Sequence, residues 1–210
     1  MGITERRERQ KAELRDTILA AASRIMAEDG FAALTMRKIA DAIEYSPATI
    51  YLHFESRDEI AMQLVRDGFA ALLAHMEPAT RVADARERIA TLGRCYVDFA
   101  RAQPQTYRLI FMEDERFAEQ VMARVKETED ADGGAFAFLT ATVRELIDDG
   151  TFVALPADTI AGLMWSALHG IASLKISCAT YPFPGDTDGP ARTMVDALVR
   201  GFSRRPDARP

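Results

Sequence analysis

Apolar residues recur every three or four positions along almost the whole chain, and this spacing is the strongest constraint on its fold. Leu14, Ile18 and Ile25 mark one face of a helix over about residues 5–28, which Asp29-Gly30 ends. No segment shows the strict alternation of apolar and polar residues that is typical of a half-buried strand. We therefore predict an all-α protein.

The same periodicity predicts helices along the rest of the chain. Two short helices follow the first, and Ser56-Arg57-Asp58-Glu59 has the pattern of a capping box that opens a longer helix, with Pro78 after its end. Further helices are expected, from their apolar positions and flanking Pro or Gly residues, at about 82–103, 107–112, 135–149, 156–179 and 191–202. The acidic stretch 126–134 is expected to be a loop.

Composition excludes several classes of protein. The chain has 210 residues, of which 48% are hydrophobic and 28% charged, as in an ordinary globular protein. Its longest apolar run, Ile160–Leu174, is shorter than the roughly 20 residues that a membrane span needs, and residues 1–15 are charged, unlike a secretory signal. Cys95 and Cys178 have no metal-like spacing. We expect a cytoplasmic protein without membrane contact, metal or cofactor.

Charge and motifs narrow the function further. The net charge is −6, and residues 1–58 carry nine Lys/Arg against ten Asp/Glu, so nucleic-acid binding would have to depend on local placement of charge. The sequence contains no glycine-rich phosphate loop, His-Glu-x-x-His pair or nucleophile elbow. We therefore do not expect an enzyme.

The most informative stretch is Thr35–Arg57. Two short helices separated by Ile43-Glu44-Tyr45-Ser46 have helix-turn-helix spacing, in which the second helix lies in the major groove of DNA. Ser46 suits an N-cap and Pro47 a first helical position, whereas Ile50 and Phe54 are spaced to face the core. The residues expected to contact bases or phosphates are Thr35, Arg37, Lys38, Ser46, Pro47, Ala48, Thr49, Tyr51, His53 and Arg57.

These residues resemble a known signature. Thr35-x-x-x-Ile39-Ala40, followed by Ser46-Pro47-Ala48-Thr49-Ile50-Tyr51-Leu52-His53-Phe54, is similar to the DNA-binding motif of the TetR family over about residues 10–60. One departure is Glu44, which replaces a glycine of the usual turn, so the turn needs either a strained backbone or a different path. The resemblance implies a helix-turn-helix DNA-binding domain over 1–58 and a ligand-binding and dimerisation domain over 59–210.

The second half carries a weaker resemblance. Gln103-Pro104-Gln105-x-Tyr107 and the later Trp165-x-x-x-His169-Gly170 look like the ligand domain of a TetR subgroup with a Trp-His-Gly signature. The candidate ligand-binding residues are Phe111, Met112, Met122, Phe138, Met164, Trp165 and His169. The candidate dimer contacts, which include small residues at every fourth position, are Gly162, Ser166, Gly170, Met194, Val195, Leu198 and Phe202. The sequence leaves open whether Trp165 and His169 contact a ligand or only pack in the core.

The resemblance implies a homodimeric repressor that binds a palindromic operator in double-stranded DNA and is released by a small-molecule effector. Two alternatives stay open: a DNA-binding dimer without a natural effector, and a helical small-molecule carrier with a vestigial helix-turn-helix. The sequence also leaves open whether Arg6, Arg7, Arg9 and Lys11 contact DNA or form a solvated helix face, because acidic residues alternate with them.

Overall fold

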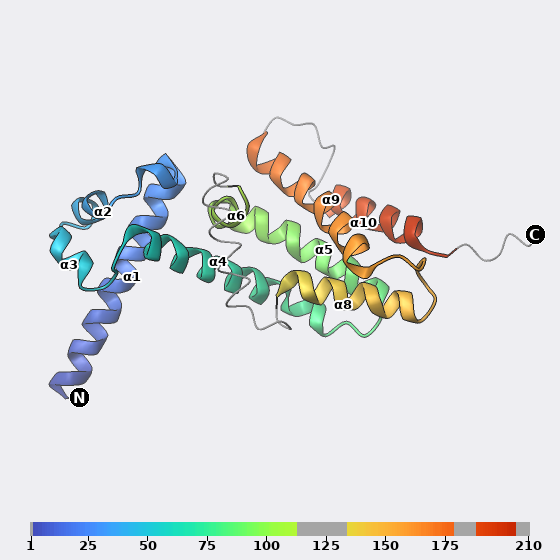
Figure 1. Cartoon of the computed structure of the whole chain (residues 1–210), viewed down its shortest axis with the longest axis horizontal. Coiled ribbons are helices and arrows are strands. Elements are labelled where there is room, and N and C mark those ends of the chain that lie inside the picture. Colours follow the sequence, from blue (N-terminus) through green and yellow to red (C-terminus); the bar gives the residue numbers. More distant parts are fainter. Residues whose placement is uncertain (1, 113–133, 179–187, 205–210) are drawn as a thin grey trace, which may run out of the picture. The chain divides into compact units, whose positions relative to one another are not determined.

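The computed structural model describes residues 2–112, 134–178 and 188–204, and Figure 1 shows that the described chain is helical, which confirms the all-α prediction. β-type pairing in these ranges is limited to one bridge between Phe152 and Ser203. The helices are α1 (Ile3–Asp29), α2 (Met36–Ala42), α3 (Pro47–Tyr51), α4 (Arg57–Thr80), α5 (Ala85–Ala102), α6 (Pro104–Phe111), α8 (Ala135–Asp148), α9 (Ala157–Ser177) and α10 (Asp188–Phe202), with a 3₁₀ turn at Phe31–Ala33. The loop expected at 126–134 lies almost entirely outside the described residues.

Packing divides the chain into two compact units. Unit 1 consists of Met1–Phe69 and Gln105–Arg124, and unit 2 of Ala70–Pro104 and Val125–Pro210. The division falls within α4, so this helix contributes residues to both cores. The functional boundary between residues 58 and 59 stays a prediction, because this division describes packing rather than function.

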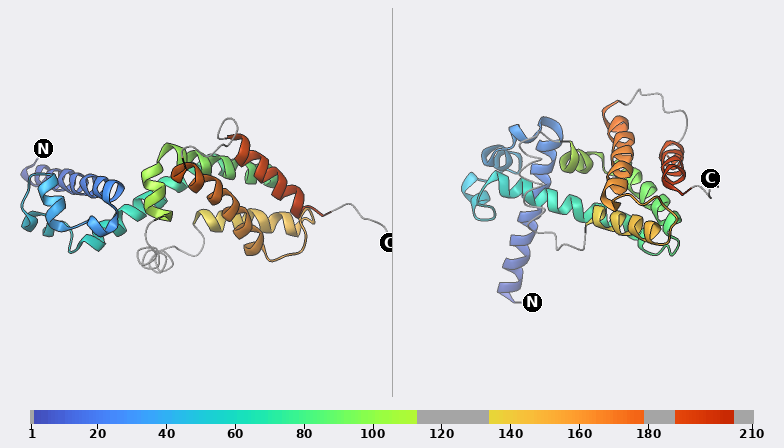
Figure 2. Two further views of the ribbon diagram at one scale, coloured as in Figure 1. Left: turned by 90° about the horizontal axis from the view of Figure 1, so that it is seen from above. Right: turned by 45° about the vertical axis from the view of Figure 1, so that its right-hand side comes forward.

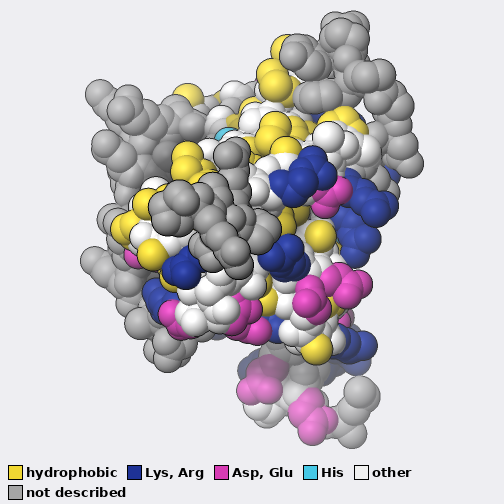
Figure 3. Space-filling model, turned by 90° about the vertical axis from the view of Figure 1, so that its right-hand side faces the viewer, with side chains coloured by type: hydrophobic (Ala, Val, Ile, Leu, Met, Phe, Trp, Pro, Cys, Tyr) yellow, Lys and Arg dark blue, Asp and Glu magenta, His cyan; other side chains and the backbone are white. Residues whose placement is uncertain are grey.

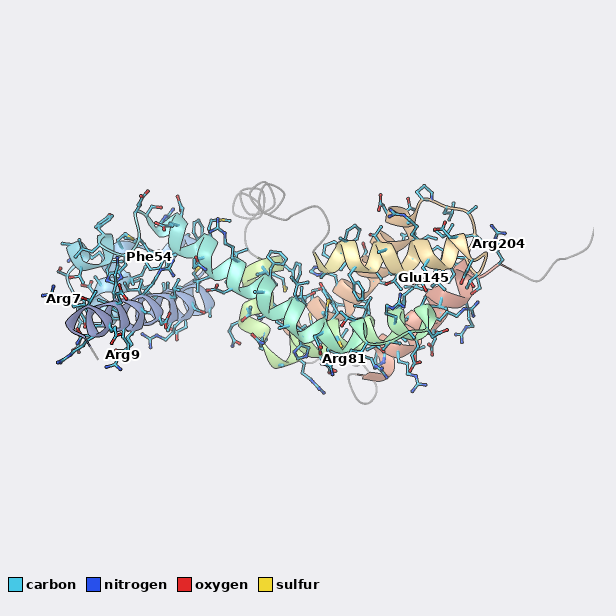
Figure 4. The ribbon with its side chains drawn as sticks, turned by 90° about the horizontal axis from the view of Figure 1, so that it is seen from below. Arg7, Arg9, Phe54, Arg81, Glu145 and Arg204 are labelled. Atoms are coloured by element: carbon cyan, nitrogen blue, oxygen red, sulfur yellow. The ribbon has the colours of Figure 1, made fainter. Side chains whose placement is uncertain are left out.

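Unit 1 is built around α1, α2, α3, the first part of α4, and α6. Ile18, Ile39, Ile50 and Ile60 are fully buried, so each of the first four helices supplies an apolar side to one core. A charged group lies at the edge of this core: the guanidinium of the half-buried Arg15 lies 4.4 Å from the centre of the Phe54 ring, a cation–π contact. Figure 4 shows Phe54 beside α1.

Unit 2 contains α5, α8, α9 and α10, which pack side by side (Figure 2). Gly93 marks a close helix contact, because a Cβ atom there would lie 2.7 Å from Val195 Cγ2 on α10 and 3.4 Å from Leu168 Cδ2 on α9. At the start of α5, the Arg88 guanidinium donates to Glu145 on α8 at 2.6 Å. Apolar packing therefore builds this unit, and an ion pair at its edge links α5 to α8.

Most helix boundaries lie within about three residues of the expected ones, since α5 begins at Ala85, α6 at Pro104 and α10 at Asp188. Asp84 caps α5 by accepting a hydrogen bond from the Glu87 amide at 2.8 Å. The prediction that α4 ends before Pro78 was wrong, since the helix runs on to Thr80. Pro78 therefore lies inside the last turn of α4, where it removes one backbone hydrogen-bond donor. None of the helices in the described ranges is long and apolar enough to cross a membrane.

Candidate nucleic-acid interface

The two short helices of unit 1 are capped as the sequence predicts. Thr35 Oγ1 accepts a hydrogen bond from the Lys38 amide at 3.0 Å and begins α2. Ser46 Oγ accepts from the Thr49 amide at 3.2 Å and begins α3, in which Pro47 is the first residue. These local bonds fix the start of each helix without help from distant parts of the chain.

The turn between α2 and α3 adopts a strained backbone. Glu44 has a φ of +59°, in the left-handed region that residues other than glycine adopt only at an energetic cost. The Tyr45 amide nevertheless donates to the Ala40 carbonyl at 3.0 Å, which closes the turn. Of the two alternatives that the missing glycine left open, the chain therefore takes the usual path with a strained residue.

The outward side of α3 is partly open. Ser46, Pro47 and Ala48 are exposed, and the Tyr51 side chain is 56% exposed. Thr49 is half-buried, with its hydroxyl 2.9 Å from Ser46 Oγ. Ile50 and Phe54 are buried on the other side, as expected. The helix therefore has one anchored face and one accessible face, although Thr49 is less accessible than Tyr51.

Two exposed apolar side chains beside α3 were not among the predicted contacts. Tyr45 in the turn is 48% exposed, and Leu52 at the end of the helix is 77% exposed. Large apolar side chains are more often buried than exposed, so residue type alone did not indicate that these two belong to the accessible surface. They extend the accessible surface around Tyr51.

His53 lies at the end of this segment in a partly enclosed position. It is half-buried, and its Nδ1 has no hydrogen-bond partner among the described residues. Burial lowers the pKa of His53 below its usual 6.5, and the positive charges of Lys11 and Arg15 lower it further. His53 is therefore neutral near pH 7 and would contact a phosphate as a neutral hydrogen-bond donor.

The predicted basic contacts are already paired within the chain. Lys38 Nζ lies 2.5 Å from Asp29 Oδ2, and Arg37 Nε lies 3.8 Å from Asp41 Oδ2. These pairs are exposed, so phosphate can compete for both cations.

Arg57 is held more firmly than the other two cations. It donates to the Leu34 carbonyl at 3.1 Å and lies over the Phe31 ring. Its Nε also lies 3.5 Å from Asp58 Oδ1. The structure therefore gives Arg57 an architectural role, and its phosphate contact stays a prediction.

Unit 2 holds an aromatic cluster around the Trp-His-Gly sequence. The Trp165 and His169 rings lie one turn apart on α9 with centres 5.5 Å apart, and Phe136 on α8 meets Trp165 edge-on at 6.4 Å. The Tyr96 hydroxyl on α5 lies 3.3 Å from His169 Nδ1. Burial lowers the pKa of His169, which favours a neutral ring that can donate or accept a hydrogen bond. The cluster thus combines apolar rings with a few polar atoms.

The other candidate ligand contacts are distributed between the units. Met164 is buried and Phe138 half-buried in unit 2. Phe111 and Met112 belong to unit 1, where the Phe111 ring packs against Phe69 and Tyr107 at centre distances of 5.8 and 4.9 Å. Met122 lies outside the described residues. Ligand contact by any of these residues stays a prediction.

The stripe of small residues on α9 faces open space. A Cβ atom at Gly162 or Gly170 would meet nothing within 4 Å, and Ser166 between them is exposed. Leu163 on the same helix is 50% exposed, and Met194 on α10 is also exposed. Hydrophobic and charged side chains share the face shown in Figure 3.

Three of the candidate dimer residues are less accessible. Val195 is only 3% exposed, because it packs against α5 within its own chain, so almost none of its surface is available to a partner. Phe202 is half-buried, with its ring centre 6.3 Å from that of Phe152, and Leu198 is also half-buried. These three residues therefore pack wholly or partly within their own chain, which leaves less of their surface for a dimer contact.

Comparison with known proteins identifies the family to which this chain is related. Residues 18–64 match the family described as bacterial regulatory proteins, tetR family, and residues 89–198 match the tetracyclin repressor-like C-terminal domain. A curated relative, the HTH-type transcriptional activator FasR of Mycolicibacterium smegmatis, is 32% identical over 92% of this chain and 85% of its own length.

Solved structures share the fold. The TetR family regulator PfmR of Thermus thermophilus superimposes with a TM-score of 0.64 at 21% identity, over 89% of this chain and 99% of PfmR. The fatty acid degradation regulator FadR of Bacillus halodurans gives a TM-score of 0.71 at 18% identity, over 88% of this chain and 94% of FadR. The motif, the fold and the relative agree: this chain belongs to the TetR family of DNA-binding transcriptional regulators, which are not enzymes.

Proposed function

We propose that two copies of this chain bind a palindromic operator as a homodimer in the cytoplasm, each placing α3 in a major groove about 34–36 Å from the other. The observation that carries the proposal is the two-sided character of α3. Its apolar side is anchored in the core of unit 1, whereas Ser46, Pro47, Ala48 and Tyr51 remain accessible.

Dimerisation is assigned to the exposed face of α9 and α10. Gly162, Ser166 and Gly170 let a second helix approach closely, and Leu163 and Met194 supply apolar area that a partner would cover. Val195 is left out of this contact surface because it packs inside its own chain. A two-fold axis through such a face would make every contact occur twice, so that a given residue of each protomer meets the same partner residue of the other.

Regulation is assigned to a small, fairly apolar effector bound in unit 2 against the Trp165 and His169 rings. Tyr96 and His169 offer polar atoms to orient such a molecule. An effector shifts operator binding only by its different affinity for two conformations, usually about 1–3 kcal/mol.

We propose repression, relieved by the effector, as the mode of control. A dimer seated in two grooves covers DNA that other proteins need. The name of the Mycolicibacterium relative states that it is an activator, so the sign needs its own test. A promoter reporter that carries the operator should give less signal when this protein is present, and more signal would contradict repression.

The DNA-binding proposal is tested by selecting duplexes from a random library with the purified protein. We expect enrichment of a palindrome, and Tyr51→Ala or Thr49→Ala should each weaken binding to it while the dimer persists in gel filtration. Thr17→Ala, an exposed threonine on α1 away from α3, is the matched control. No enrichment at low salt would overturn the proposal in favour of a carrier.

The effector is sought by melting curves with a panel of apolar and cationic compounds. A ligand that binds the folded protein raises its melting temperature, and we expect His169→Gln to reduce that rise. If no compound stabilises the protein, the dimer would be a regulator without a natural effector.

A further inference from the structure

We propose that the first three turns of α1 contact the DNA backbone beside α3 through a basic stripe, defined as Arg7 and Lys11. This inference rests on the proposed function, because it adds a contact to the same interface. It answers a question that the sequence left open, namely whether the N-terminal arginines and lysine bind DNA or only water.

The helical spacing places the stripe in line with the core. Arg7, Lys11, Leu14 and Ile18 follow one another at intervals of four, three and four residues, so they share one side of α1. Ile18 is buried and Leu14 half-buried in unit 1, whereas Arg7 and Lys11 are exposed. The stripe therefore continues the packed side of α1 beyond the point where the core ends.

The packed side of α1 faces the end of the recognition segment. Arg15, one turn after Lys11, lies over the ring of Phe54, which directly follows His53. The positive charge of Lys11 is close enough to lower the pKa of His53. Lys11 thus lies near the last residues of the segment that we place in the groove.

The opposite side of α1 has a mixed charge. Arg9 forms an ion pair with Glu13 at 3.6 Å, and Glu5 lies one turn before Arg9 on the same side. Figure 4 shows Arg9 on the side of α1 that faces away from Phe54. Glu8 lies at the edge between the two sides. The acidic residues that alternate with the basic ones in sequence are therefore mostly separated from the stripe in space.

Phosphate is the partner that fits this stripe. A helix in the major groove has a phosphate backbone along each edge of the groove, so a basic side chain next to its end meets phosphates rather than bases. Arg7 and Lys11 are long and exposed, and neither forms an ion pair with an acidic residue in the described part of the chain. Phosphate contacts of this kind need no sequence readout.

The test compares two double variants that remove the same charge from the same turns. Arg7→Gln with Lys11→Gln removes the stripe, and Arg6→Gln with Arg9→Gln removes two charges from the other side. Each protein is titrated with the duplex that the wild-type protein enriches, over a series of salt concentrations. Circular dichroism and gel filtration are the checks that both variants keep the helical fold and oligomeric state of the wild type.

We expect the stripe variant to bind more weakly, by on the order of tenfold or more, and to reduce the slope of log affinity against log salt by between about 2 and 4, because the dimer loses two phosphate contacts in each protomer. The other variant should change both quantities much less. Equal effects of the two variants, or wild-type binding by the stripe variant, would overturn the contact while the proposed function stands. If the wild type enriches no duplex, the proposed function itself fails and this contact fails with it.

Discussion

Lys38 Nζ on α2 lies 2.5 Å from Asp29 Oδ2, the last residue of α1. The pair joins a predicted phosphate contact to a carboxylate that belongs to the same unit. Because both side chains are about half exposed, the bond adds little to folding stability. We expect its greater effect to be on DNA binding, because phosphate would have to displace the Asp29 carboxylate before it could contact Lys38.

We therefore predict that Asp29→Asn strengthens operator binding, by up to about fivefold for each half-site of the operator, since an exposed ion pair is worth at most about 1 kcal/mol. Fluorescence anisotropy with the enriched duplex measures the change. Asp16→Asn, which removes an exposed carboxylate elsewhere on α1, is the control for net charge. Weaker binding by Asp29→Asn would mean that Asp29 orients Lys38 toward the phosphate instead of competing with it.

Glu44 gives a prediction about stability. Its left-handed backbone costs about 1 kcal/mol or more in a residue with a side chain, and glycine does not have this cost. Glu44→Gly should raise the free energy of unfolding by roughly 1 kcal/mol, measured by chemical denaturation. Glu44→Ala removes the same charge but keeps the strain, so it should not stabilise the protein. Equal stabilisation by both variants would attribute the gain to charge.

Two glycines in unit 2 should respond oppositely to alanine. Gly93→Ala places a Cβ atom 2.7 Å from Val195 Cγ2, and overpacking of this kind should lower the free energy of unfolding by about 1–3 kcal/mol. Gly170→Ala meets open space within the chain and improves helix propensity. If Gly170 lies in the dimer contact, its alanine variant should instead show weaker dimerisation in sedimentation analysis. Unchanged stability of Gly93→Ala would contradict the close contact between α5 and α10.

The lowered pKa of His169 leads to a prediction of how the free energy of unfolding depends on pH. Burial lowers its pKa in the folded protein, so the unfolded chain takes up a proton first as the pH falls below about 6.5. The stabilisation from its neutral form is present above that pH and is lost as the pH falls further. Chemical denaturation at pH 7.5 and at pH 5.5, at one protein concentration, measures the free energy of unfolding at each pH. The loss of that free energy between pH 7.5 and 5.5 should be smaller for His169→Gln than for the wild type. Tyr96→Phe leaves the imidazole in place and should keep the wild-type difference.

The helices and their caps could be predicted from sequence because each depends on residues close together in the chain. Thr35 and Ser46 begin the helices they precede, as expected, and the apolar periodicity identified Ile39, Ile50 and Phe54 as buried. The same local reasoning left two possible backbones for Glu44, since nearby residues alone do not decide between strain and a different path.

The roles of individual surface residues could not be predicted in this way. Arg57 contacts Leu34, more than twenty residues away, and Val195 packs against Gly93 from another helix. Such pairings depend on how elements pack, which the spacing along one helix does not contain. The division of α1 into a basic and a mixed side could be read from spacing, but its orientation toward α3 required the position of Arg15 over Phe54.

Leu52 has a further physical consequence. Its side chain is 77% exposed at the end of α3, so most of its apolar surface is hydrated in the free protein. Covering a leucine side chain is worth about 1.5–3 kcal/mol when the burial is complete. If DNA covers this side chain, the contact releases water rather than ions. Its contribution to binding would then persist at salt concentrations that abolish attraction to phosphate. Any binding that remains in concentrated salt should accordingly depend on this leucine more than on the surrounding cations.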